Sequence, residues 1–202
     1  MLSGIDPAAP IGNGYDGMPP ELTGEVVTTH QTSMETACAI ALGSNLGDSE
    51  QTIETALARL ERIEGMRLGV QADQPVRARS QLYKTAPVGP PQPDYINACA
   101  IFHTTLSPEQ VLQALLATEA SFGRLRRERW GPRTLDLDLL FYGDRVMDTS
   151  SLTLPHPRMH ERAFVLVPLA EIAPDWRHPV NQQTVKELLN QVKTSGVYPL
   201  VA

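Results

Sequence analysis

Short apolar runs and amphipathic segments alternate along most of the chain. Residues 37–42 (ACAIAL) form a continuous apolar run, which predicts a central strand. The segment after it carries apolar residues at helical spacing, and Asp48 stands where an N-cap residue is expected, so a helix should begin there. Residues 76–85 and 95–105 are expected to contain further strands, and the loop over 86–94 between them carries four prolines.

The second half of the chain continues this alternation. Residues 107–110 (SPEQ) combine a serine cap, a proline at the first helical position and a glutamine that completes a capping box, which predicts a helix. Residues 134–143 (TLDLDLLFYG) are typical of a fourth strand, 160–171 of a third helix, and 185–192 of a small C-terminal helix. This order of elements predicts an α+β, ferredoxin-like sandwich, an antiparallel sheet with helices on one face.

Residues 1–35 do not share this pattern. They are rich in glycine, proline and threonine and show no sustained periodicity. We expect an N-terminal extension that is mobile and lies outside the core. An arm that docks on a partner subunit is the alternative. The folded domain is therefore expected to cover residues 36–202.

Composition restricts the class of protein. The chain of 202 residues suits one domain, and its 42% hydrophobic and 20% charged residues are typical of a soluble globular protein. A net charge of −6 disfavours a general nucleic-acid-binding protein but leaves room for a local basic site. Cys38 and Cys99 lie in apolar runs and match no metal-ligand spacing, so we expect them to be reduced and buried. With no signal-peptide pattern and no apolar run of roughly 20 residues, we expect a cytoplasmic protein.

Two aspartates alternate with leucines in the predicted strand 134–143. Because successive side chains on a strand point to opposite faces, Asp136 and Asp138 should share one face while the leucines point into the core. Two carboxylates this close suit Mg²⁺, which takes one or two carboxylates and completes its shell with water and phosphate oxygens. The alternative is a solvent-facing strand with two ordinary acids.

A cluster of basic residues precedes this strand. Five arginines fall within ten residues: Arg124, Arg126, Arg127, Arg129 and Arg133. Guanidinium groups match phosphate oxygens in a bidentate way, and Mg²⁺ with arginine is the recurring equipment of phosphoryl transfer. A solvated helix end explains the first arginines equally well, and a nucleic-acid patch in which Trp130 stacks on a base is a second alternative.

Four further residues are candidates for binding. Glu119 falls on or beside the apolar face of its helix, where it could bind a ligand hydroxyl or amine, or pair with an arginine at the rim. Tyr95 and Asn97 share a strand face and offer a ring and an amide to a flat heterocycle, although such a tyrosine is also common at a core edge. His156 stands between two prolines, where it could donate a hydrogen bond to phosphate or have a structural role. The GSNLGD segment lacks the lysine of a Walker A loop.

The motifs taken together resemble those of a known family. ALGSNLGD, YKTAPVGPPQPDYINA, EASFGRLRRERWGPRTLDLDLLFYG and LPHPRMHERAFVLVPLAEIAPDW occur in the order found in the 6-hydroxymethyl-7,8-dihydropterin pyrophosphokinases of folate biosynthesis. The similarity runs from about Ala37 to the C-terminal region. It implies a ferredoxin-like domain that transfers pyrophosphate from ATP to the hydroxymethyl group of the dihydropterin and releases AMP.

The resemblance also implies roles for individual residues. Two Mg²⁺ ions would be held by Asp136 and Asp138. The pterin would be bound by Thr85, Pro87, Val88, Tyr95, Asn97 and Phe164. ATP would be bound by Glu119, Arg126, Trp130, Arg133, Thr153, His156 and Arg162. The catalytic set would comprise Arg124, Arg133, Asp136 and Asp138, with Arg124 on a mobile loop that closes over the reactants.

Some features depart from the family pattern. Ser151 stands where some members carry an arginine that contacts ATP, and the proline loop is one residue shorter than in some members. Two other functions compete with the transferase: an RNA- or nucleotide-binding module without catalysis, and a phosphohydrolase. The expected partners are the small-molecule substrates, with neither nucleic acid nor membrane. A monomer is expected, and other oligomeric states remain open.

Overall fold

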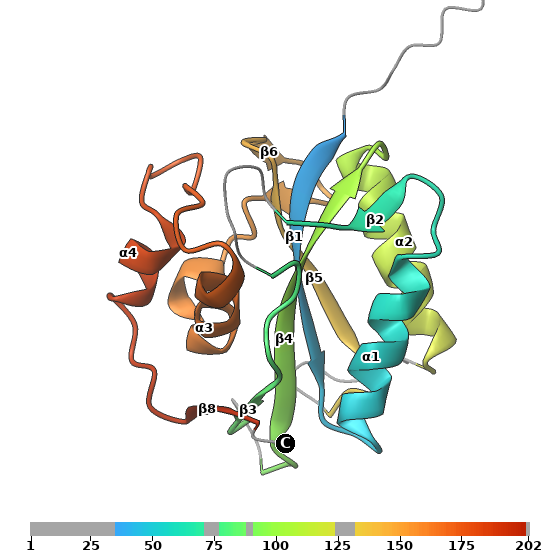
Figure 1. Cartoon of the computed structure of the whole chain (residues 1–202), viewed down its shortest axis with the longest axis vertical. Coiled ribbons are helices and arrows are strands. Elements are labelled where there is room, and N and C mark those ends of the chain that lie inside the picture. Colours follow the sequence, from blue (N-terminus) through green and yellow to red (C-terminus); the bar gives the residue numbers. More distant parts are fainter. Residues whose placement is uncertain (1–34, 71–76, 88–90, 124–131, 201–202) are drawn as a thin grey trace, which may run out of the picture. The chain divides into compact units, whose positions relative to one another are not determined.

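The computed structural model describes residues 35–70, 77–87, 91–123 and 132–200. The chain divides into the units Met1–Thr32 and Ser33–Ala202, and all described residues belong to the second. Among them, helices and strands follow the predicted alternation, and the elements are labelled in Figure 1.

A six-stranded antiparallel sheet forms the centre of the described residues. Its order is β5-β1-β4-β3-β8, and β2 pairs with the far part of β4. The strands are β1 (Thr36–Ser44), β2 (Met66–Leu68), β3 (Tyr83–Thr85), β4 (Tyr95–Thr104), β5 (Asp136–Tyr142) and β8 (Val197–Pro199). A short hairpin, β6 (Met147–Asp148) with β7 (Thr153–Leu154), follows β5.

Two helices cover one face of the sheet (Figure 1). Helix α1 (Ser49–Leu60) begins at Asp48, whose side chain accepts the N–H of Gln51 at 3.0 Å. Helix α2 (Pro108–Ser121) begins with the predicted capping box. Their apolar residues, such as Ile53 and Leu115, pack against alternate side chains of the sheet. Both predicted helix starts are therefore confirmed.

The opposite face carries α3 (Ala163–Ile172) and α4 (Val185–Leu189). The predicted third helix over 160–171 is a 3₁₀ turn, η1 (Met159–Glu161), followed by α3. The α+β class and the antiparallel sheet are confirmed. The prediction that helices lie on one face holds for α1 and α2 only, because α3 and α4 cover the opposite face. The physical reason is that β1 and β4 are apolar on both faces, so each face needs a cover.

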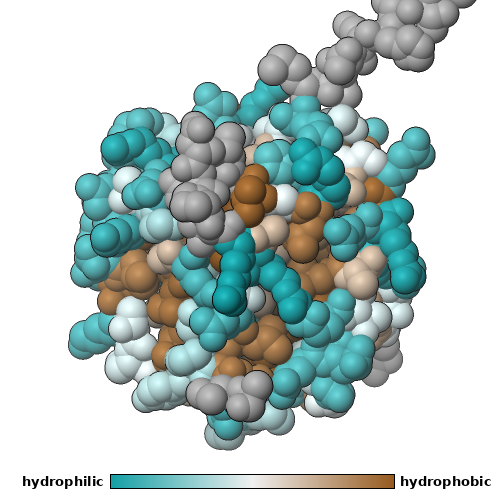
Figure 2. All heavy atoms as spheres, in the orientation of Figure 1, coloured by the Kyte–Doolittle hydropathy of each residue, from teal (hydrophilic) through white to brown (hydrophobic). Residues whose placement is uncertain are grey.

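Polar and hydrophobic residues mix on the surface (Figure 2). The large hydrophobic residues that are exposed within the described ranges come from separate segments: Leu46, Val70, Val146, Val180 and Tyr198. In the same ranges, no helix is both long enough and apolar enough to cross a membrane.

Candidate active site

Polar side chains gather at one end of the three central strands. Within the sheet, Gly43 of β1 pairs with Asn97 of β4 on one side and with Asp136 of β5 on the other. We call these three residues the strand-end row, or simply the row. Two residues earlier along β1, on the same face, Ala41 pairs with Cys99 and Asp138. Residues paired across a sheet share a face, and Cys99 packs against the α3 side, so these groups lie on the face that α3 covers.

Strand β5 aims the two aspartates as its pattern predicts. Leu137 and Leu139 point into the core on the α1 and α2 side, which turns Asp136 and Asp138 to the opposite face. Their side chains are 26% and 35% exposed, so both remain accessible to a ligand. The strand thus presents two carboxylates on one face.

Each aspartate is paired with an arginine. Arg133 Nη1 donates to Asp136 Oδ2 at 2.6 Å, and Arg162 Nη1 donates to Asp138 Oδ2 at 3.3 Å. The guanidinium of Arg162 also lies 5.6 Å from the centre of the Phe164 ring. The two guanidinium groups place positive charge beside both carboxylates. Arg162 therefore links Asp138 to an aromatic residue of α3.

His156 approaches Asp138 from the outer side of β5. The N–H of His156 donates to the carbonyl of Leu140 at 2.9 Å, and its Nδ1 accepts the N–H of Arg158 at 3.2 Å. Burial lowers the pKa of His156, the Asp138 charge opposes this shift, and Arg162 adds to it. A neutral ring whose Nδ1 accepts carries its proton on Nε2. This Nε2 lies 3.7 Å from Asp138 Oδ2.

The predicted pterin-binding residues line the β3–β4 side of the row. Asn97 Nδ2 donates to Thr85 Oγ1 at 2.7 Å, and both side chains are buried. The hydroxyl of Tyr95 donates to Gln92 Oε1 at 3.4 Å. Phe164 is partly buried at the start of α3, and Pro87 is half-buried just after β3. An amide and two aromatic rings are therefore brought to this end of the sheet.

Glu119 lies inside the molecule and not at its rim. Its side chain is 2% exposed, and Oε1 accepts the N–H of Leu137 at 2.7 Å. Leu137 stands between Asp136 and Asp138, so Glu119 of α2 supports the strand that carries both carboxylates. Thr153, also predicted to bind ATP, lies in β7, where its hydroxyl donates to Asp148 at 3.2 Å.

Some predicted residues lie outside the described ranges. Val88 of the proline loop is one of them. So are the basic residues predicted to bind ATP or to close over it, together with the tryptophan between them: Arg124, Arg126 and Trp130. Of the arginine cluster, the structure describes Arg133 alone.

The sequence analysis missed Asn45, which joins the loops around the row. Its side chain is 3% exposed and bonds to Arg133, Gln92 and Pro93. The GSNLGD motif was interpreted as a helix start and a family motif that lacks a Walker A lysine, with no role for its asparagine. The available signal was an asparagine directly after a buried strand, in a position where it can hydrogen-bond backbone groups.

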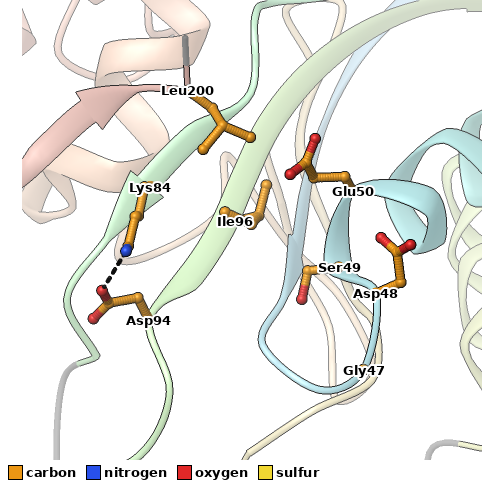
Figure 3. Close-up of a pocket in the computed structure, with 8 residues that line it drawn as sticks. All are labelled: Gly47, Asp48, Ser49, Glu50, Lys84, Asp94, Ile96 and Leu200. Carbon is orange, nitrogen blue, oxygen red and sulfur yellow. Dashed lines mark ion pairs between the residues drawn. The ribbon is translucent and has the colours of Figure 1, made fainter. Parts of the chain in front are cut away.

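A separate pocket lies on the other face of the sheet (Figure 3). It measures about 430 Å³ and is lined by Gly47, Asp48, Ser49, Glu50, Lys84, Asp94, Ile96 and Leu200. The ammonium of Lys84 lies 3.2 Å from Asp94. Ile96 packs on the α1 side, whereas its neighbour Asn97 faces the α3 side. The pocket therefore shares none of its lining residues with the row.

Comparison with known proteins gives consistent results. The family model of 7,8-dihydro-6-hydroxymethylpterin-pyrophosphokinase (HPPK) matches residues 39–174. A Synechocystis 2-amino-4-hydroxy-6-hydroxymethyldihydropteridine pyrophosphokinase is 48% identical over 161 residues, which cover 80% of this chain and 78% of that protein. A Pseudomonas aeruginosa protein of the same name is 43% identical over 159 residues, 78% of this chain and 93% of that one.

A solved structure resembles the fold. The chain of a Plasmodium falciparum HPPK-DHPS triple mutant with SDX-DHP matches with a TM-score of 0.61 at 15% identity. The match covers 80% of this chain and 45% of that one, so the present chain spans less than half of the solved chain. At this identity the likeness concerns the fold alone.

Proposed function

Because the chain belongs to the 7,8-dihydro-6-hydroxymethylpterin-pyrophosphokinase family, we propose that its strand-end row is where pyrophosphate passes from ATP to hydroxymethyldihydropterin. The transfer itself, a step in folate biosynthesis, is the activity of the family. The observation that carries the location is the pairing of Gly43 with both Asn97 and Asp136. This pairing places the Asn97 amide, which can hydrogen-bond a heterocycle, and the Asp136 carboxylate on the same face of the sheet, two strands apart.

Asp136 and Asp138 fit a magnesium site. They supply hard oxygen donors from one face of β5, and Mg²⁺ needs one or two such carboxylates. Within the described ranges, no group of three or more His, Cys, Asp and Glu could hold an ion. At a two-carboxylate site, phosphate and water oxygens would supply the other ligands. Two Mg²⁺ ions held here would neutralise negative charge on the group that is transferred from ATP, the co-substrate.

The neighbouring cations act on the triphosphate. In the structure, Arg133 and Arg162 pair with the two aspartates. Mg²⁺ held by these carboxylates would compete with the two guanidinium groups, which could then donate to phosphate oxygens. The Nε2–H of neutral His156 is a further donor beside Asp138. Since transfer of this kind depends on positioning and charge stabilisation, these groups suit a role in the transition state.

The pterin is bound at the end of the row opposite Asp136, where Asn97 lies. Asn97 uses its amino group on Thr85, which leaves Oδ1 to accept from a ring N–H of the pterin. This oxygen lies over Gly43, at 3.0 Å from the position a Cβ would take there. Tyr95 and Phe164 supply faces on which a flat ring can stack. Pro87 and Val88 complete the proposed pterin set.

The remaining assignments rest on the family resemblance. We assign Glu119, Arg126, Trp130 and Thr153 to ATP binding, and Arg124 to closure over the reactants. The catalytic domain is proposed to span residues 36–202, with residues 1–35 as an extension. A cytoplasmic monomer that binds its small-molecule substrates, and neither nucleic acid nor membrane, is the simplest state of such an enzyme.

The test is to identify the nucleotide product. Protein, Mg²⁺ and ATP should yield AMP only when 6-hydroxymethyl-7,8-dihydropterin is added, because the bond broken lies between the α- and β-phosphates. Formation of ADP would place the attack on the wrong phosphorus. A phosphohydrolase would release phosphate without pterin, and a nucleotide-binding module would bind without turnover and without Mg²⁺.

A further inference from the structure

Asn45 is a buried junction between two loops that border the row. It follows β1, and its side chain is 3% exposed. On one side its N–H donates to the carbonyl of Arg133 at 3.1 Å, and its Oδ1 accepts the N–H of Arg133 at 2.7 Å. On the other side its Nδ2 donates to Gln92 Oε1 at 3.0 Å and to the carbonyl of Pro93 at 3.1 Å.

Two of the partners of Asn45, Gln92 and Arg133, each touch a residue assigned to one substrate. Gln92 Oε1 also accepts the hydroxyl of Tyr95 at 3.4 Å, on the pterin side. The side chain of Arg133 donates to Asp136 Oδ2 at 2.6 Å, on the metal side. A continuous set of hydrogen bonds therefore runs from Tyr95 through Asn45 to Asp136.

The position requires the chemistry of asparagine. One side-chain atom accepts a backbone N–H, and the other donates twice, which an aspartate or an alanine cannot do. The backbone conformation does not explain why asparagine stands at position 45. Asparagine is favoured where φ is positive, but in the described ranges the non-glycine residue with positive φ is Gln182. The side-chain bonds are thus the reason for asparagine here.

We propose that Asn45 is a positioning residue that holds the pterin-side loop in a fixed place relative to Arg133 and Asp136. It acts through these partners and contacts neither substrate. Two reacting groups on separate loops need such a connection, because a small error in their alignment slows transfer even when both are bound. This role rests on the proposed location of the active site.

Asn45→Asp tests the connection with minimal change of shape. The variant keeps an acceptor for the Arg133 N–H but sets a second acceptor against Gln92 Oε1 and the Pro93 carbonyl. At saturating substrates we expect kcat to fall on the order of 10- to 100-fold. Both KM values should stay within about threefold of wild type, because each substrate keeps its own contacts.

Two further variants separate positioning from folding. Gln92→Ala removes one partner on the half-buried loop and should lower kcat in the same direction by less. Combined with Asn45→Asp it should add little, because both changes interrupt one connection. Ser44→Ala is the matched control, since it removes a part-buried hydrogen bond to Ser49 between the end of β1 and the start of α1, and neither residue is a partner of Asn45. Its kcat should stay at the wild-type value.

The outcomes are distinct. A normal kcat in Asn45→Asp, or fully additive losses with Gln92→Ala, would overturn the positioning role while wild-type AMP formation leaves the proposed function intact. Absence of pterin-dependent AMP in the wild type would instead contradict the function. If Asn45→Asp does not fold, as judged by circular dichroism, the kcat of Gln92→Ala decides.

Discussion

At the residue scale, Gly43 illustrates how space rather than backbone freedom selects an amino acid. It is paired on both sides within the sheet and is not among the glycines with positive φ. A Cβ there would lie 3.0 Å from Asn97 Oδ1 and 4.0 Å from the Cβ of Asp136. Strands lie about 4.8 Å apart, so a substrate reaching from Asn97 to Asp136 crosses roughly 10 Å directly above Gly43.

Gly43→Ala should therefore impair the pterin more than the nucleotide. The added methyl group displaces the Asn97 amide, so we expect the KM for the dihydropterin to rise roughly 5- to 150-fold, as overpacking by about 1–3 kcal/mol would produce. Affinity for Mg²⁺-ATP, measured by calorimetric titration, should change little. Equal losses for both substrates would show that the row is not divided in this way.

His178 gives a prediction for pH dependence. Burial lowers the pKa of His178, His160 lowers it further, and the ring contacts Phe141 edge-on at 5.9 Å between centroids. The unfolded chain then binds a proton more readily than the folded one, so stability is lost as pH falls below the ordinary histidine range. Between pH 7.5 and 5.5, Tm should decline less steeply in His178→Phe than in wild type. Parallel Tm profiles would contradict this.

At the element scale, the two-sided apolar pattern of β1 and β4 explains the layered core. The strands with long apolar runs and the helices with caps were predictable, because their signals are local. The strands β2, β3 and β8 have three residues each, and β6 and β7 have two. Segments this short carry no periodicity, so their pairing depends on tertiary contacts that the sequence pattern does not contain.

The start of α2 provides a test at this scale. Ser107 accepts the N–H of Gln110 at 3.3 Å, and the Gln110 side chain accepts the N–H of Ser107 at 2.8 Å. Ser107→Ala should lower the free energy of unfolding by about 1 kcal/mol, measured in urea. The cap lies at the far end of α2 from Glu119, so kcat should not change. A loss of turnover without a loss of stability would contradict this division.

At the scale of the whole molecule, the site joins residues that are far apart in the chain. The D-x-D face and the Tyr95–Asn97 pair were predicted from strand alternation, and the family from the motifs together. The placement of Asn97 and Asp136 on either side of Gly43 required the strand order, since the two are separated by 39 positions. The role of Asn45 required the fold as well, because its partners come from two other loops.

In the proposed mechanism, transfer takes place on the face of β5 that carries Asp136 and Asp138. The direct test is single-turnover formation of AMP in the presence of Mg²⁺, ATP and dihydropterin, compared between Asp136→Ala, Asp138→Ala and wild type. The control is Asp144→Ala, which changes an exposed residue of the turn after β5. Losing several kcal/mol of charge stabilisation should slow each of the first two on the order of 10³-fold or more, with their fold retained by circular dichroism. The control should match wild type. Near-normal AMP formation in both aspartate variants would show that transfer does not depend on this face of β5.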